Sequence, residues 1–129
     1  EVGQPLKVLT KPAITRAQLH DYAKASGDGN LIHLDETFAQ QAGFPSVIVH
    51  GMISMAYLGD HLQLNFPSEQ FKVLKLRSRF RKVTFPGDVL SCEGKVKKID
   101  ADGRTWVSLL TRNQRGEITT EGEAEIQQS

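Results

Sequence analysis

The sequence predicts an α+β fold in which an antiparallel sheet of about five strands wraps around one long buried helix. Residues 47–66 are strongly apolar, and the first helical turns after Gly51 have almost no polar face, which is typical of a buried helix. Four strand-like runs separated by turn residues fill the second half of the chain. With 129 residues, 39% of them hydrophobic, the chain is long enough to form one domain, residues 1–129, with its own core.

The first half of the chain is predicted to be mostly helical. The expected helices span residues 16–25, 36–42 and 51–66. Thr15 and Gln18 fit a capping box, in which Thr15 caps the first helix and the Gln18 side chain reaches back. Asp35 is expected to cap the second helix, and Gly43 is expected to end it in a left-handed conformation.

The second half is predicted to be a meander of antiparallel strands. The expected strands span residues 71–83, 89–99, 104–112 and 117–126, and residues 5–11 form an additional short strand. Pro86-Gly87-Asp88 and Asp100–Gly103 are the clearest turn signals between them. Such a sheet has an edge strand, which a dimer that continues the sheet would cover.

Composition and charge exclude several classes of protein. The formal net charge of +1 gives no reason to expect a nucleic-acid partner. No apolar run approaches the roughly 20 residues of a membrane span, and residues 1–5 lack the basic and apolar regions of a secretory signal. The lone Cys92 cannot form an internal disulfide, which favours a cytoplasmic location, and we expect it to be a packed strand residue.

Asp28 and His33 are the candidate acid/base pair. They lie five residues apart across a glycine-containing turn, so in a loop both side chains can reach one small volume. A carboxylate and an imidazole that hold one water molecule can exchange protons near neutral pH. Each residue also has a structural interpretation, because an aspartate in such a turn usually forms the turn and a histidine between aliphatic residues usually belongs to the core.

The segment from Tyr22 to Ala39 carries a more specific pattern. Its residues are Tyr22, Ser26, Gly27, Asp28, Asn30, Ile32, His33 and Ala39. This pattern resembles the signature of the MaoC-like, (R)-specific enoyl-CoA hydratases, as do His50-Gly51-Met52 and the Val83–Asp88 turn. One position departs, because Leu31 stands where the family usually has proline, whose fixed φ would stiffen the turn.

The resemblance implies a hotdog fold and, usually, a homodimer. It also implies an enzyme that hydrates trans-2-enoyl thioesters to (R)-3-hydroxyacyl thioesters, or catalyses the reverse dehydration, in fatty-acid or polyhydroxyalkanoate metabolism. It implies no metal and no redox cofactor, since CoA or acyl carrier protein is part of the substrate. Asp28, His33 and Gly51 are the implied catalytic residues, and Ser26 and Asn30 the implied substrate-binding residues. The Gly51 amide would stabilise the thioester oxygen from the start of the buried helix. A packing glycine at Gly51 and a local turn hydrogen bond from Asn30 are the alternatives.

Alternation along the strand over residues 71–83 predicts a row of cations. Lys75, Arg77, Arg79 and Arg81 fall on one face of this strand. We expect Arg77 and Arg79 to bind the phosphates of CoA or the acidic surface of a carrier protein. The alternative is a solvated sheet face without a binding role.

Two other functions are compatible with a hotdog fold. A hotdog thioesterase commonly has a carboxylate in its central helix, but the first one here is Asp60, more than about two turns after Gly51. A non-catalytic acyl-CoA-binding domain is the other alternative, although the complete Asp28/His33 pair disfavours it. A higher oligomer or a heterodimer with a second hotdog subunit is also compatible with the sequence. His50, which precedes Gly51, is expected to be structural.

Overall fold

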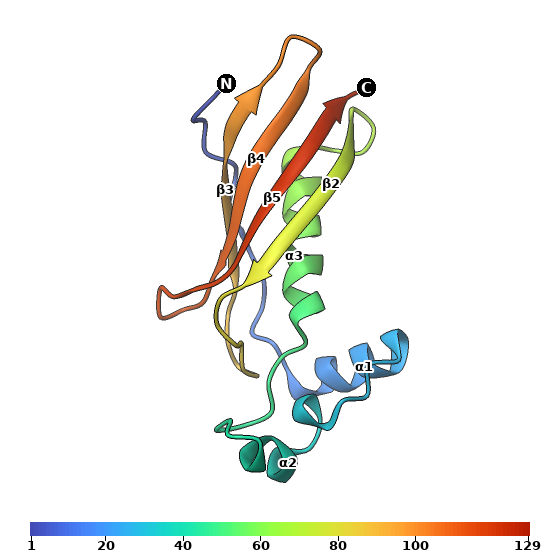
Figure 1. Ribbon diagram of the computed structural model, residues 1–129, viewed down its shortest axis with the longest axis vertical. Helices are drawn as coiled ribbons and strands as arrows, with labels where there is room; N and C mark the ends of the chain where they lie inside the picture. Colours follow the sequence, from blue (N-terminus) through green and yellow to red (C-terminus); the bar gives the residue numbers. More distant parts are fainter.

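The computed structural model describes all 129 residues and contains one five-stranded antiparallel sheet that curls along a long helix (Figure 1). The strands are β1 (Leu9–Thr10), β2 (Phe71–Phe80), β3 (Ser91–Ile99), β4 (Arg104–Arg112) and β5 (Ile118–Gln128). The helices are α1 (Arg16–Ser26), the 3-10 helix η1 (Leu31–His33), α2 (Glu36–Gln41) and α3 (Gly51–Asn65). The predicted fold class is therefore confirmed, and α3 is the central helix.

The sheet has the strand order β1-β3-β4-β5-β2, so the predicted meander is wrong in one connection. β2 does not pair with β3, which follows it in the chain. It pairs with β5 at the opposite edge, with Leu76 opposite Ala124. The connection over residues 81–90 explains this result, because hairpin loops are usually two to five residues long and this longer segment crosses the end of the sheet.

The N-terminal strand is shorter than the seven residues predicted. Only Leu9 and Thr10 pair regularly with β3, while the segment before them follows the same edge through separate hydrogen bonds. The amide of Leu6 donates to the Gly94 carbonyl at 2.8 Å, and the amide of Lys11 donates to the Leu90 carbonyl at 3.0 Å. This segment thus covers the outer edge of β3 without forming a continuous strand.

Helix α3 packs one face against the concave side of the sheet. Leu58 and Leu62 are buried in the core with Val107 of β4 and Ile126 of β5. Gly122 of β5 allows this approach, because a Cβ atom there would lie 3.1 Å from Leu58 Cδ1. None of the helices has the length and apolarity that a membrane crossing requires.

Helices α1 and α2 lie together beyond the N-terminal end of α3 (Figure 1). The predicted caps are present, since the amide of Gln18 donates to Thr15 Oγ1 and the amide of Phe38 donates to Asp35 Oδ1. The Gln18 side chain does not reach back as a capping box requires. It donates to the Tyr57 hydroxyl at 2.7 Å and so joins α1 to α3.

Cys92 of β3 is fully buried, as expected for a packed strand residue. Its thiol contacts the carbonyl oxygen of Tyr57 at 3.5 Å. Burial raises the pKa of the thiol to about 11, so Cys92 is protonated at neutral pH. A buried thiol in the protonated form is a poor nucleophile.

Candidate active site

The loop between α1 and η1 is built by three side chains that bond to nearby amides. The amide of Asp28 donates to Ser26 Oγ (3.1 Å), that of Asn30 to Asp28 Oδ1 (3.3 Å), and that of Ile32 to Asn30 Oδ1 (3.1 Å). Each bond spans two residues, as in Asx and Ser/Thr turns. Gly27 ends α1 with a φ of 79° and so starts the loop. Together these contacts give the loop a defined path although Leu31 replaces proline.

His33 ends η1 and is 8% exposed. Its Nδ1 lies 2.7 Å from the carbonyl oxygen of Ile48. A carbonyl oxygen can only accept, so Nδ1 carries the hydrogen, and in the neutral ring Nε2 keeps a lone pair. His33 also lines a cavity at the start of α3. The hydrogen bond to Ile48 thus leaves Nε2 as the ring nitrogen that can exchange a proton.

His50, the residue before α3, supports both members of the pair. Its ring stacks on the His33 ring, with the centroids 3.8 Å apart and the planes inclined by 23°. Its Nε2–H donates to the main-chain carbonyl of Asp28 at 3.2 Å. Burial lowers the pKa of His50, and its Nδ1 has no hydrogen-bond partner. The neutral form of His50 therefore fixes the Asp28 loop and the His33 ring together.

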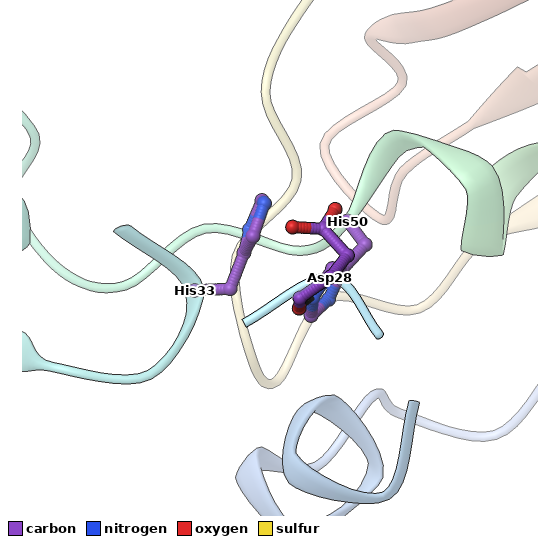
Figure 2. Close-up of side chains that lie close together, drawn as sticks. All are labelled: Asp28, His33 and His50. Atoms are coloured by element: carbon purple, nitrogen blue, oxygen red, sulfur yellow. Dashed lines mark hydrogen bonds between the residues drawn. The ribbon is translucent and has the colours of Figure 1, made fainter. Parts of the chain in front are cut away.

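Figure 2 shows the side chains of Asp28, His33 and His50 close together. One carboxylate oxygen of Asp28 and one ring nitrogen from each of His33 and His50 all lie within 4.8 Å of one another. Asp28 is exposed and makes no direct side-chain hydrogen bond to His33. Polar groups at separations beyond direct hydrogen-bond distance can be bridged by a water molecule. Stacked imidazole rings direct their lone pairs along near-parallel planes, so the two histidines are poorly oriented to share one metal ion.

The cavity beside His33 has a volume of about 260 Å³. Gly51, the first residue of α3, lines it, and no group of the protein accepts a hydrogen bond from the Gly51 amide. The first amides of a helix point away from its N-terminus and carry its partial positive charge. A Cβ atom on Gly51 would lie 2.8 Å from the ring of Phe80, so only glycine fits here without movement of that ring.

The fold adds cavity residues that the sequence analysis did not identify. The polar ones are Ser54, Lys82, Thr84 and Thr120, and Arg81 of the predicted cationic row lines the cavity with them. They come from α3, from the connection after β2 and from β5, and only the tertiary structure brings them together. A local signal existed for Ser54 alone, because it is the one serine or threonine in the apolar first turns of α3.

The remaining predicted site residues lie outside this cavity. The Ser26 and Asn30 oxygens are used in the turn bonds of the loop, and neither residue lines the cavity. Arg77 and Arg79 lie on the solvent face of β2, opposite Glu123 and Glu121 of β5. Neither arginine forms an ion pair, whereas Arg81, which does line the cavity, pairs with Glu121 at 3.0 Å.

The predicted Pro-Gly-Asp turn holds the cavity wall in place. Asp88 is 4% exposed and accepts hydrogen bonds from the amide of Phe85 and from the Gln114 and Arg115 side chains. Glu117 joins Arg115 to the cavity residue Lys82. Hydrogen bonds from the side chains of Lys82, Asn113 and Arg115 lower the pKa of Glu117 to about 2. The turn is therefore structural, and it positions the segment that contains Arg81 and Lys82.

A comparison with family models decides the family. The model described as "MaoC like domain" matches residues 1–117. The chain belongs to the MaoC-like family. The region that matches includes the Asp28 loop, His50-Gly51 and every cavity residue except Thr120, so the MaoC-like assignment covers nearly all of the candidate site.

Individual relatives agree with the MaoC-like assignment. The chain is 30% identical over 128 residues to the "(R)-specific enoyl-CoA hydratase" of Aeromonas caviae, which covers 98% of this chain and 93% of that protein. It is 32% identical to "Fatty acid synthase 2" of Mycosarcoma maydis, but covers only 3% of that much longer protein. The solved structure of R-hydratase PhaJ1 from Pseudomonas aeruginosa superposes with a TM-score of 0.89 at 32% identity, over 99% of this chain and 81% of that one. The predicted hotdog fold is confirmed.

Proposed function

We propose that this chain is a hydro-lyase that hydrates trans-2-enoyl thioesters to (R)-3-hydroxyacyl thioesters, or catalyses the reverse dehydration. The observation that carries this proposal is the placement of Asp28 and His33 within 4.8 Å of each other, next to a cavity that the free Gly51 amide also lines. The hydratase names of its relatives in Aeromonas caviae and Pseudomonas aeruginosa support it. The reaction needs no metal or redox cofactor.

In the proposed reaction Asp28 and His33 bind one water molecule between them. The water oxygen attacks C3 of the conjugated thioester, and one water proton passes to the pair, for which His33 Nε2 is an acceptor. A proton then passes from the pair to C2, so the pair has the same number of protons after turnover. Negative charge develops on the thioester oxygen during the attack, and the Gly51 amide is placed to stabilise it.

We propose that the cationic row on β2 binds the phosphates of CoA or an acidic carrier protein. Arg81, directly after the end of β2, lines the cavity, and Arg79 and Arg77 precede it at alternate positions on one face of β2. The absence of ion pairs at Arg77 and Arg79 leaves both guanidinium groups available for phosphate. The carboxylates of β5 that face them limit the net attraction, so the expected effect is on substrate affinity rather than on the chemical step.

The oligomeric state and location belong to the same proposal. We propose that residues 1–129 act as one MaoC-like domain in the cytoplasm, as a homodimer or beside a second hotdog subunit. β2 is the edge strand of the sheet and exposes Val73 and Leu74, so a second subunit that pairs along it would cover both the edge and these side chains.

The thioesterase alternative is disfavoured by the position of Asp60. This carboxylate of α3 is exposed and forms an ion pair with Lys11 at 2.6 Å. It does not line the cavity that contains His33 and Gly51. A general base for thioester hydrolysis would have to lie near the thioester carbon, and α3 offers no carboxylate there.

The first test is hydration of crotonyl-CoA and of a medium-chain trans-2-enoyl-CoA, followed by the loss of enoyl-thioester absorbance. The His33→Ala and Asp28→Asn variants serve as controls. We expect turnover by the parent and a decrease of kcat by about 100- to 10,000-fold in each variant, with unchanged circular dichroism. Near-parental turnover in either variant would exclude the proposed pair. If CoA release replaces hydration, the protein is a thioesterase.

A further inference from the structure

Ser54 is a buried hydroxyl for which the mechanism above has no role. It is 3% exposed, lies in the first turn of α3, and lines the cavity with His33 and Gly51. A serine inside a helix often donates to the carbonyl four residues earlier, which here belongs to His50. Ser54 does not make that bond, and its hydroxyl has no other partner in the protein. The hydroxyl is therefore free to bond to a molecule in the cavity.

Helix geometry brings the Ser54 hydroxyl near the Gly51 amide. Residues three apart in a helix lie on the same face, and each Cα–Cβ bond tilts toward the helix N-terminus. The Ser54 side chain therefore extends over the first turn of α3. The N–H of Gly51, which has no acceptor in the protein, lies in the same turn. Both donors line the same cavity, beside the ring of His33.

We propose that Ser54 is a further catalytic residue, whose hydroxyl donates a second hydrogen bond, beside that of Gly51, to the thioester oxygen of the substrate. This proposal rests on the hydratase function proposed above. Donors that are fixed before the reaction stabilise an oxygen most strongly when negative charge develops on it in a site with little water. The Ser54 bond should therefore strengthen in the transition state and act on kcat more than on KM.

Two other hydroxyls in the cavity provide a matched comparison. Thr84 and Thr120 are also buried and their side chains make no hydrogen bond, but they belong to other elements, namely the connection after β2 and strand β5. Thr120→Val removes a hydroxyl from the same cavity without changing α3. It separates a specific effect of Ser54 from a general effect of polarity in the cavity.

The kinetic test compares Ser54→Ala, Ser54→Thr and Thr120→Val in crotonyl-CoA hydration. We expect Ser54→Ala to lower kcat by about 100-fold with little change in KM, and Ser54→Thr to recover most of the loss. The thermal unfolding midpoint should not fall in Ser54→Ala, because no hydrogen bond is lost and alanine favours the helix more than serine does. A parental kcat in Ser54→Ala, or an equal loss in Thr120→Val, would overturn the proposal.

A spectroscopic test does not depend on turnover. A conjugated 2,4-dienoyl-CoA absorbs at longer wavelength when hydrogen bonds polarise its carbonyl group. In an Asp28→Asn background, where hydration is blocked, we expect a red shift on binding that becomes smaller when Ser54→Ala is added. An unchanged red shift would exclude Ser54 as a carbonyl donor. If the parent does not hydrate crotonyl-CoA but this shift depends on Ser54, the proposed reaction fails and the thioester-binding role of Ser54 stands.

Discussion

The imidazole rings of His33 and His50 are stacked with their centroids 3.8 Å apart. This contact joins η1 to the residue before α3, and the His50 ring also donates to the carbonyl of Asp28. The residue expected to be structural is therefore in contact with both members of the proposed catalytic pair. Its two roles, ring packing and hydrogen bonding, can be separated by substitution.

His50→Phe should keep the stacked ring but lose the hydrogen bond to Asp28. Because the Asp28 loop is then less well fixed, we expect kcat to fall by up to about 100-fold, while the free energy of unfolding changes by less than about 1 kcal/mol. His50→Ala should also lose the packing and cost about 3 kcal/mol in stability. Steady-state kinetics and denaturant unfolding of both variants test this. A His50→Phe variant with parental kcat would show that the hydrogen bond does not position Asp28.

Leu31→Pro should stabilise the protein and leave activity unchanged. The Leu31 amide donates no hydrogen bond, and Asn30 already has φ −57° and ψ 127°, which a following proline allows. We expect a gain of about 0.4–1 kcal/mol in the free energy of unfolding, from a smaller entropy of the unfolded chain. Ile32→Pro is the control, since its amide donates to Asn30 Oδ1, and it should destabilise the protein. A loss of stability in Leu31→Pro would contradict this account of the loop.

Stability should fall below about pH 6.5 because of two buried histidines. Burial lowers the pKa of His61 and of His50 from 6.5, so the unfolded chain binds these protons at a higher pH than the folded protein does. The contribution of the two neutral histidines to the free energy of unfolding is therefore complete above pH 6.5. It is lost as the pH falls, by at most about 1.4 kcal/mol per pH unit for each group. Urea unfolding between pH 8 and pH 5 measures this dependence. His61→Asn should show a shallower decrease, and an identical decrease would exclude His61 as a cause.

Neutralising Arg77 and Arg79 together should raise KM for CoA substrates and leave kcat unchanged. Glutamine is the suitable replacement, because glutamate would add repulsion against Glu121 and Glu123 across the strand pair. KM of the parent should rise with salt concentration, and that of the variant should rise less. The control is a double variant in which Lys95 of β3 and Arg104 of β4, on the outer face of the sheet, are replaced by glutamine, because it removes the same amount of positive charge. Equal KM values in both double variants would show that Arg77 and Arg79 belong to a solvated sheet face without a binding role.

The elements of the fold were predictable where the pattern is local. The apolar turns of α3 and the turn signals between β3, β4 and β5 identify these elements to within a few residues. The position of β2 next to β5 was not predictable, because it depends on the path of residues 81–90 across the end of the sheet. The length of β1 was overestimated for a related reason, since an extended segment at a sheet edge need not pair continuously with its neighbour.

The candidate site shows the same division. Asp28 and His33 belong to one short segment, so a sequence pattern could single them out together. Thr84 and Thr120 are far apart in the chain and meet only after the sheet has formed. The alternation of Arg77, Arg79 and Arg81 was visible in the sequence, but the opposing carboxylates Glu121 and Glu123 were not, because strand pairing sets that register.

The hydrogen bond from His33 Nδ1 to the Ile48 carbonyl has a consequence for mutational tolerance. A main-chain oxygen is present whatever side chain occupies position 48, so no substitution at that position removes the acceptor directly. The same holds for His50, which bonds to the main-chain oxygen of Asp28. The tautomers of both histidines are thus set by the path of the backbone, and changes in neighbouring side chains that preserve this path leave the proton-exchanging nitrogen of His33 directed at the cavity.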